Sequence, residues 1–322
     1  MPRKMNVSIV IVSWNTKKIL RNCLASIYTQ TAESVEFEVI VVDNASNDDS
    51  VQMVEKEFPQ VLLIQNPENR GFAAANNQGV RVSKGRYVLL LNPDTIVLDN
   101  AIAKVVSFAD TSKDIAVVGC RVLNIDHTLQ PTCFMYPSIL NMLLSSCYLY
   151  KLFSKSHFFG RERMSWWDRN DVREVDVVTG CFMLIRREAI EQVGLMDERF
   201  FMYGEETDWC YRFKKAGHKV VYMPFAEIIH LGGESTKQVA TRMMLLNKGS
   251  KLLFLRKHKG VFVYALACLL TALFFFIRVP YWLIRSLASR KNEKRERLKR
   301  AQTYVMGGFY AIVGGSGLYR AS

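Results

Sequence analysis

Short runs of β-branched and aliphatic residues alternate with amphipathic stretches over the first hundred residues. The runs lie at 7–12, 37–42 and 87–91, and the apolar residues at 16–29 have helical spacing. Continuous apolar runs are typical of strands buried on both faces, as in a parallel sheet with helices on each side. The sequence therefore predicts an α/β fold.

This alternation is interrupted between residues 124 and 175. The segment contains Pro131, Pro137 and an apolar helical stretch at 139–153, and we interpret it as an insertion beside the functional site. No internal repeat is evident. The remaining predicted elements are helices at 48–58, 73–83 and 187–193, a helix within the block 200–212, and strands at 61–64, 175–185 and 219–223.

Polar side chains follow three of the predicted strands. Ser13 and Asn15 follow the first, Asp43 follows the second, and Asn92 and Asp94 follow the strand at 87–91. Ligands of open α/β sheets bind beyond the carboxyl ends of the strands, where a carboxylate can hold a divalent cation bound to a phosphate ester. The structural alternative is that a strand-end aspartate caps the next helix or turn.

Two further candidates lie in the second half of the chain. Glu205 and Glu206 are adjacent carboxylates before a predicted helix, and like-charge repulsion would raise the pKa of one of them, as suits a general base. They could equally complement the helix dipole. His230 ends an apolar run at a glycine-rich turn, where a lone histidine is usually structural.

Positive charge is concentrated near the C-terminus. The chain has a net charge of +13, of which residues 256–300 contribute +10 and residues 1–255 only +2. A nucleic-acid enzyme more often spreads positive charge over its folded surface. We therefore expect no nucleic-acid partner and favour anionic lipid.

An uncharged run of 17 residues at 261–277 lies inside this basic region. It is at the lower limit for a membrane-spanning helix, and its basic flanks on both sides conflict with a single span. A re-entrant or interfacial helix broken near Pro280 satisfies both flanks, with Tyr281 and Trp282 at the interface. A buried core helix is the alternative.

Composition and cysteine spacing exclude several classes of protein. With 49% hydrophobic and 23% charged residues, the chain is neither disordered nor a small disulfide-linked scaffold. Its seven cysteines form no Cys-x-x-Cys pair, so we expect free thiols in a reducing compartment. The apolar stretch near the N-terminus is too short for a signal peptide.

The order of these motifs is more specific than any one of them. The chain resembles the family 2 glycosyltransferases with the GT-A fold, and within them the bacterial rhamnosyltransferase-like group. The matching stretches are residues 10–15, 41–46, 69–79, 90–95, 179–187 and 200–212, with His230 downstream. The resemblance implies a mainly parallel sheet in a GT-A domain at 1–255 (a nucleotide-sugar half at 1–123 and an acceptor half at 124–255), and a membrane-associated region at 256–322.

The resemblance also assigns roles to individual residues. Asp43 matches the group that accepts a hydrogen bond from the pyrimidine, Glu205 and Glu206 match the acidic pair whose second member is usually the base, and Asp94 and His230 match the ligands of Mg²⁺ or Mn²⁺. The further matches are Ser13, Asn15, Asn69, Arg70, Asn76 and Asn92 at the nucleotide sugar, and Gly180 and Asp208 at the acceptor.

Two positions depart from the family pattern. The metal motif begins with Asn92, so only Asp94 brings a charge, and diphosphate and water would complete the coordination. The acidic pair usually reads Glu-Asp, whereas Glu206 has one methylene more, which leaves the choice between Glu205 and Glu206 open.

The predicted reaction is a metal-dependent, inverting transfer of a sugar from a nucleotide diphosphate. The resemblance favours dTDP-rhamnose as donor, and the apolar tail favours a polyprenyl-diphosphate-linked saccharide as acceptor, at the cytoplasmic face of the inner membrane in surface polysaccharide synthesis. The stretch at 139–153, with Trp166 and Trp167, either faces that lipid or packs over the sheet.

Two alternatives belong to other functional classes. A catalytically silent, membrane-bound module that binds nucleotide sugars would need Asp43 and the tail but not Glu206. A dinucleotide-dependent oxidoreductase is disfavoured because no Gly-x-Gly-x-x-Gly follows the first strand.

Overall fold

The computed structural model describes residues 5–31, 35–232, 240–287, 289–315 and 318. It divides the chain into two compact units. The first unit comprises Met1–Tyr136, Arg163–Phe201 and Glu205–Lys237, and the second comprises Pro137–Glu162, Met202–Gly204 and Gln238–Ser322.

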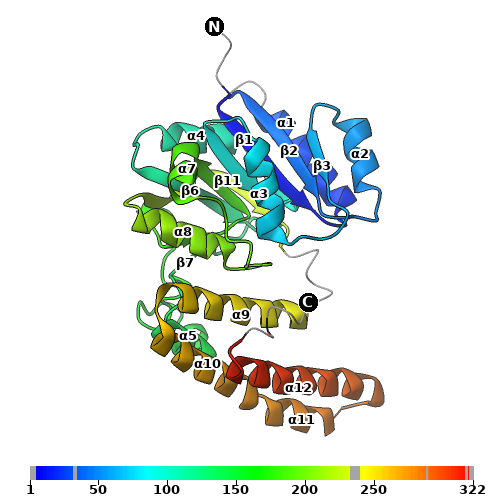
Figure 1. Cartoon of the computed structure of the whole chain (residues 1–322), viewed down its shortest axis with the longest axis vertical. Helices are drawn as coiled ribbons and strands as arrows, with labels where there is room; N and C mark the ends of the chain where they lie inside the picture. Colours follow the sequence, from blue (N-terminus) through cyan, green and yellow to red (C-terminus); the bar gives the residue numbers. More distant parts are fainter. Residues whose placement is uncertain (1–4, 32–34, 233–239, 288, 316–317, 319–322) are drawn as a thin grey trace. The chain divides into compact units, whose positions relative to one another are not determined.

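A mixed sheet forms the centre of the first unit (Figure 1). Among the described residues the strand order is β3 (Leu62–Gln65), β2 (Phe37–Asp43), β1 (Val7–Ser13), β4 (Tyr87–Leu91), β10 (Phe182–Arg186), β6 (Ile115–Leu123), β11 (Lys219–His230) and β5 (Thr95–Val97). β1 is parallel to β2 and β4, β2 is parallel to β3, and β6 is parallel to β11, whereas β10 and β5 are antiparallel to their neighbours. β8 (Arg173–Glu174) pairs with β11, and β7 (Cys133–Phe134) pairs separately with β9 (Val177–Val178).

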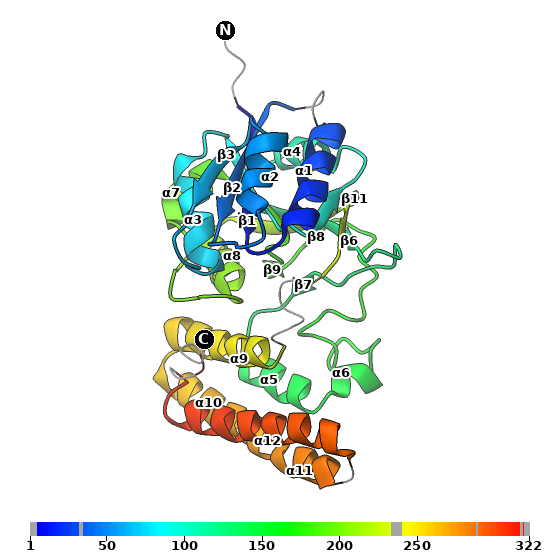
Figure 2. The same ribbon diagram turned by 90° about the vertical axis from the view of Figure 1, so that its right-hand side faces the viewer.

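Helices cover both faces of this sheet, as Figures 1 and 2 show. α1 (Lys17–Thr31), α2 (Ser50–Glu57) and α4 (Ala101–Ala109) pack on one face, and α3 (Phe72–Val82), α7 (Arg187–Val193) and α8 (Glu205–Lys215) on the other. A hydrophobic core lies on each face of the sheet. Within β1, Ile9 and Ile11 belong to the core beneath α1, α2 and α4, and Val10 belongs to the core beneath α3, α7 and α8, because side chains of a strand alternate between its faces. The predicted α/β fold is confirmed.

The second unit is helical. It contains α5 (Ile139–Ser146), α6 (Leu149–Leu152), α9 (Ala240–His258), α10 (Val261–Phe276), α11 (Val279–Leu287) and α12 (Lys291–Ile312), and α10 packs against α5, α9 and α12. The boundary expected at residue 255 therefore differs from the structure. α9 and the segment 137–162 belong with the C-terminal helices, because α9 and α5 bury their apolar sides against α10.

Three predicted elements differ in extent. The helix expected at 139–153 is interrupted after α5, where Tyr148 adopts a φ of 54°. The strand at 219–223 continues to His230, because a register shift between Met223 and Glu227 lets the strand pass Pro224. The predicted strand at 175–185 is divided into β9 and β10 by a turn at Gly180.

A glycine lets α3 approach β1 closely. A Cβ atom placed on Gly79 would lie 2.4 Å from Cγ1 of Val10, which is fully buried in the central strand. We expect Gly79→Ala to lower the free energy of unfolding by about 1–3 kcal/mol through overpacking, although alanine is the better helix former by about 1 kcal/mol. Urea unfolding of the purified protein measures this.

Val82→Ala on the same helix is the matched control. The Val82 side chain is 41% exposed, so we expect a change within about 0.5 kcal/mol. Equal stability of the two variants would contradict the close packing of α3 on β1.

Candidate functional site

Strand register brings the predicted residues to one edge of the sheet. Ser13 pairs with Asp43 at the ends of β1 and β2, and β4 runs parallel to β1 toward Asn92. The amide of Asn92 donates to the carbonyl of Cys181 at 3.0 Å, which brings the turn at Gly180 to the same edge. The expected convergence of strand ends is therefore present.

Asp94 and His230 meet although 136 positions separate them in the sequence. Thr95 pairs with His230 between β5 and β11, and the amide of Leu231 donates to the carbonyl of Asp94 at 2.9 Å. The imidazole Nε2 then lies 3.2 Å from Oδ1 of Asp94, with side-chain exposures of 14% and 11%. The backbone pairing itself holds the two side chains together.

Gln130 fixes the orientation of the His230 ring. The Gln130 amide nitrogen donates to Oδ1 of Asn124 at 2.8 Å and to the carbonyl of His230 at 3.2 Å, so its oxygen faces Nδ1 of the imidazole at 2.6 Å. Because that oxygen only accepts, Nδ1 carries the proton. Nε2 is then directed at Asp94 and at the amide nitrogen of Asn92, 3.4 Å away.

Sequence reasoning missed Gln130, which lies in the segment interpreted as an insertion. The available signal was that Asn124 comes directly after a mainly apolar run at 115–123, where strand-end polar residues are expected, and that Gln130 follows six residues later. A hydrogen bond to the second ring nitrogen is the usual support of a metal-binding histidine.

The donor set at Asp94 and His230 fits a divalent cation. One carboxylate oxygen and one imidazole nitrogen are held close together, and both are ligands of Mn²⁺-type ions. Among the described residues no cluster of three or more His, Cys, Asp or Glu side chains could hold a metal. The protein would thus supply two ligands, and oxygen atoms of the bound substrate and water the others.

Asp43 combines burial with an unused acceptor. Its side chain lies at the end of β2, and Oδ2 accepts from the amide of Ser46 at 2.9 Å. Oδ1 is buried and has no hydrogen-bond partner in the described part of the chain. A buried carboxylate oxygen without a partner is costly, and a ligand N–H would satisfy it.

The residues near Asp43 shape a loop. Asn15 has a φ of 53°. Its side-chain Oδ1 accepts from the main-chain N–H of Asn47 at 2.8 Å, and its main-chain N–H donates to Oγ of Ser46 at 2.8 Å. The Ser13 hydroxyl is buried and lies 2.9 Å from the hydroxyl of Thr16. In this structure, Asn15 holds the loop after β2 and Ser13 supports the start of α1.

A network of side-chain amides holds the segment before α3. Asn44 donates to Oδ1 of Asn69 at 3.0 Å and accepts from Asn66 at 3.0 Å and from the amide of Arg70 at 3.2 Å. The Arg70 side chain remains exposed. Asn44 and Asn66 were not among the predicted site residues, because polar residues that shape a loop carry no signal distinct from ordinary turn residues.

Phe72 links this segment to two other parts of the site. Its amide donates to the carbonyl of Phe201 at 2.8 Å, and its ring lies 3.4 Å from where a Cβ on Gly180 would be. Gly71 has a φ of 82°, and a Cβ there would lie 2.6 Å from the carbonyl oxygen of Phe201. Asn76 is buried on α3 and donates to the carbonyl of Phe72 at 2.9 Å.

The acidic pair occupies the first turn of α8. Glu205 is only 5% exposed, and its Oε2 has no hydrogen-bond partner within the described residues. Burial, together with the negative charge of Glu206, raises the pKa of Glu205 well above its ordinary value. Glu206 is partly exposed and is the more accessible of the two carboxylates.

Asp208 has partners inside the protein. Its side chain is fully buried and accepts from Nε of Arg212 at 2.8 Å, and Arg212 also donates to the carbonyls of Val193 and Leu195. The carboxylate thereby fixes α8 to the turn after α7. Its predicted place at the acceptor stays a prediction.

The sequence profile of glycosyl transferase family 2 matches residues 8–194. This range is more than half of the chain and includes the ends of β1, β2 and β4 and the turn at Gly180. The protein belongs to this family and is a glycosyltransferase, as its motifs predict.

The chain is also similar to individual glycosyltransferases. The N-acetylglucosaminyl-diphospho-decaprenol L-rhamnosyltransferase of Mycobacterium tuberculosis is 26% identical over 264 residues, which cover 78% of this chain and 85% of that protein. The UDP-Glc:α-D-GlcNAc-diphosphoundecaprenol β-1,3-glucosyltransferase of Escherichia coli is 30% identical over 108 residues, covering 33% of this chain and 42% of that protein.

Solved structures confirm the fold class. The mannosyltransferase of Pyrobaculum calidifontis, solved with GDP-Man and Mn²⁺, superposes with a TM-score of 0.57 at 15% identity and covers 97% of this chain and 88% of that chain. The likeness establishes the GT-A fold.

The raised pKa of Glu205 makes stability depend on pH. Below the ordinary pKa of glutamate, Glu205 carries a proton in both the folded and the unfolded protein, and its contribution to stability is fully present. This contribution is lost as pH rises through the higher pKa of the folded state, because the folded protein then has to bury a charge. We expect Glu205→Gln to remove this loss. Its free energy of unfolding should exceed that of the wild type increasingly between acidic and neutral pH, as measured by urea unfolding at a series of pH values.

Glu191→Gln serves as the control for that measurement, because Glu191 lies exposed on α7. Its pH dependence should match that of the wild type. Parallel curves for wild type and Glu205→Gln would show that Glu205 is not buried as a destabilising carboxylate.

Proposed function

We propose that this glycosyltransferase moves a sugar, with L-rhamnose from dTDP-rhamnose as the first choice, to a polyprenyl-diphosphate-linked saccharide. The reaction would be metal-dependent and inverting, and would take place at the cytoplasmic face of the inner membrane in bacterial surface polysaccharide synthesis. The observation that carries the proposal is the 3.2 Å pair of Asp94 and His230, with the imidazole oriented by Gln130.

Asp94 and His230 are the residues that would hold Mg²⁺ or Mn²⁺. When bound there, the ion would stabilise the negative charge that develops on the diphosphate as the bond to the anomeric carbon breaks. The ring orientation set by Gln130 supports this assignment, since Nε2 is left available as a ligand.

Nucleotide binding is proposed at the ends of β1 and β2. The unpartnered Oδ1 of Asp43 is suited to accept a hydrogen bond from the imide N–H of a pyrimidine. Ser13, Asn15, Asn69, Asn76 and Asn92 are proposed to shape this donor site. The exposed side chain of Arg70 is proposed to contact the donor phosphates, because guanidinium groups bind phosphate oxygens well.

Glu206 is the proposed general base. The acceptor hydroxyl is a weak nucleophile at neutral pH, so its proton must leave as the oxygen attacks the anomeric carbon. The raised pKa of Glu205 favours a proton on that carboxyl, which leaves the negative charge on Glu206. A single displacement of this kind inverts the anomeric centre. Gly180, in the turn beside Phe72, is proposed to contact the acceptor.

The lipid-linked acceptor is supported by two relatives and by the surface of the second unit. Both relatives are named for diphospho-polyprenol acceptors. In the described residues one helical segment, Val261–Leu287, is long and apolar enough to cross a membrane. Eight of its exposed apolar residues recur every three or four positions and form one stripe: Phe262, Leu266, Leu269, Leu273, Ile277, Tyr281, Ile284 and Leu287. Val261 and Leu283 are exposed as well.

This stripe favours a helix pair that lies in one leaflet. α10 is covered on its other sides by α5, α9 and α12, and α12 begins with a highly charged segment that packs along α11. A basic helix with one apolar face is typical of an interfacial position. The stripe and the concentration of positive charge at 256–300 together support binding to anionic lipid.

Replacement of the proposed base tests the catalytic assignment. Glu206→Gln keeps the shape of the side chain but cannot take a proton, so we expect kcat to fall by about 10²–10⁴-fold. Transfer from dTDP-rhamnose to an N-acetylglucosaminyl-diphospho-polyprenol, with a panel of other donors, measures it. Glu191→Gln should retain wild-type turnover.

Binding of dTDP by calorimetry accompanies this assay. Unchanged dTDP binding by Glu206→Gln with turnover lost supports a base. Near-normal turnover contradicts the assignment. Wild-type protein that binds dTDP but transfers no sugar from any donor would instead favour a silent nucleotide-sugar-binding module.

The metal assignment is tested through the residue that orients the imidazole. We expect Gln130→Ala to weaken Mn²⁺-dependent dTDP binding by about 10–100-fold, and Asp94→Ala to abolish the Mn²⁺ dependence. Calorimetry with and without Mn²⁺ measures both effects.

Asp126→Ala, in the exposed turn between Asn124 and Gln130, is the control and should bind as the wild type does. Equal dTDP affinity with Mn²⁺ and with chelator in the wild type would rule out a metal at this pair.

A further inference from the structure

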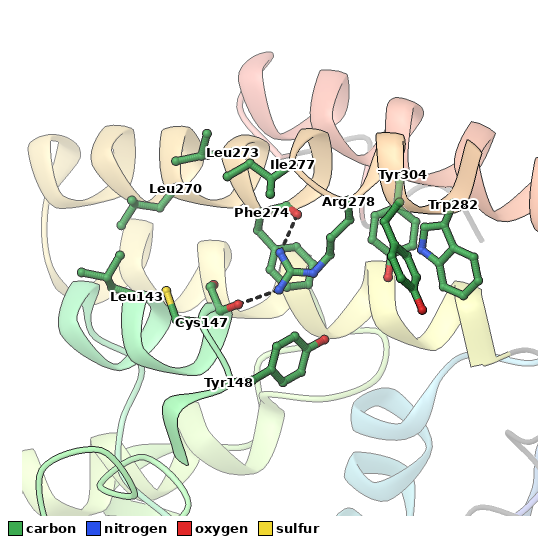
Figure 3. Close-up of a pocket in the computed structure, with 12 residues that line it drawn as sticks. Leu143, Cys147, Tyr148, Leu270, Leu273, Phe274, Ile277, Arg278, Trp282 and Tyr304 are labelled. Carbon is green, nitrogen blue, oxygen red and sulfur yellow. Dashed lines mark hydrogen bonds between the residues drawn. The ribbon is translucent and has the colours of Figure 1, made fainter. Parts of the chain in front are cut away.

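A cavity of about 680 Å³ lies within the second unit, lined by α5, α10, α11 and α12. Figure 3 shows that its two ends differ in chemistry. Leu143, Leu270, Leu273 and Ile277 lie on one side of the Arg278 side chain, and Trp282 and Tyr304 on the other. The cavity thus combines an aliphatic wall, a central cation and a wall of amphipathic aromatic rings.

The cation is fixed by the protein and retains hydrogen-bond donors. Arg278 donates through one amino group to the carbonyl of Phe274 and through the other to the carbonyl of Ser146, and its Cζ lies 3.8 Å from the centre of the Phe274 ring. A guanidinium has five N–H donors, of which these bonds occupy two. The group is therefore oriented and can still bind an anion.

A second basic side chain contacts the same ring. Nζ of Lys248 lies 3.8 Å from the centre of Phe274, whereas the neighbouring Lys251 pairs with Glu162. Burial and the adjacent charge of Lys251 lower the pKa of Lys248 to about 7. Arg278 is therefore the cation on which the site depends, and an anion bound beside it would also favour the charged form of Lys248.

The cavity adjoins the apolar stripe of α10 and α11. Leu273, Ile277 and Tyr281 line the cavity, and they are also 50%, 62% and 51% exposed on the stripe. An amphiphile in contact with the stripe can therefore reach the cavity along a continuous apolar surface. A water-soluble nucleotide has no apolar part to contact the aliphatic wall, and a neutral lipid has no negative charge to pair with Arg278.

We propose that this cavity binds the polyprenyl phosphate portion of the acceptor lipid, with isoprenoid units against Leu143, Leu270, Leu273 and Ile277 and a phosphate oxygen beside Arg278. The inference rests on the proposed lipid-linked acceptor. A volume within the range of small-molecule pockets holds the part of the chain next to the phosphate, and the remainder would stay in the bilayer.

Two leucines one helical turn apart provide a matched test. Leu269 and Leu273 both lie exposed on the stripe, at 63% and 50%, but only Leu273 is among the residues that line the cavity. Leu273→Trp fills the cavity, whereas Leu269→Trp adds the same bulk outside it. Each full-length variant is incorporated into phosphatidylcholine nanodiscs and titrated with C55 polyprenyl phosphate, followed by native mass spectrometry.

We expect Leu273→Trp to weaken binding of polyprenyl phosphate at least tenfold, and Leu269→Trp to change it less than twofold. Neutral C55 polyprenol, phosphatidylglycerol and inorganic diphosphate are compared as ligands. The proposal requires the wild type to prefer polyprenyl phosphate over each of them. Equal affinity of both tryptophan variants, or no preference over phosphatidylglycerol or polyprenol, would overturn it.

The charge is tested separately. Arg278→Gln should remove the preference for polyprenyl phosphate over polyprenol, whereas Arg285→Gln, on the exposed side of α11, should keep it. A preference retained by Arg278→Gln would also overturn the proposal. If Arg278→Gln does not fold, the comparison of Leu273→Trp with Leu269→Trp still tests whether the lipid binds in the cavity.

Failure of this inference can be distinguished from failure of the proposed function. If the wild type transfers sugar to the lipid-linked acceptor while Leu273→Trp binds polyprenyl phosphate normally, the cavity is not the lipid site. The proposed transferase activity would then still stand. Selective polyprenyl phosphate binding lost in Leu273→Trp, without transfer by the wild type, would support the cavity and refute the proposed reaction.

Discussion

The antiparallel pairing of β5 with β11 determines where the site can form. Asp94 precedes a strand of only three residues, and His230 ends a strand of twelve. Because Thr95 is opposite His230, the side chains of Asp94 and His230 meet through the main-chain pairing of the two strands. If the pair binds a metal as proposed, the sheet would hold both ligands in place before the ion arrives.

The sequence predicted those parts of the site that depend on strand direction. Ser13, Asp43 and Asn92 end parallel strands, and parallel strands must present their carboxyl ends at one edge. Gln130 could not be predicted in the same way, because its partner His230 is 100 residues away and no local pattern links them. The ion pair of Asp208 with Arg212 could not be predicted either, because the motif alone does not show which carboxylates pair inside the protein.

The second unit was predicted in part. The apolar run at 261–277 identified α10, but α9 and α12 were not expected. α9 has weak amphipathic character, and α12 begins with charges on all sides. Both helices depend on packing against α10 rather than on their own hydrophobic pattern. Of the predicted insertion at 124–175, the part at 137–162 belongs with them for the same reason, because α5 buries Met142 and Leu144 in the second unit.

Two buried carboxylate oxygens in the described part of the first unit have no hydrogen-bond partner. Oδ1 of Asp43 and Oε2 of Glu205 each forgo a hydrogen bond in the described part of the chain, a cost of about 1–3 kcal/mol for such a group. The two atoms are satisfied differently. The pyrimidine N–H of the proposed nucleotide would satisfy Oδ1 of Asp43, whereas binding a proton lowers the cost of burying Glu205. A proton on Glu205 would also reduce the repulsion between this carboxyl group and Glu206, the proposed base.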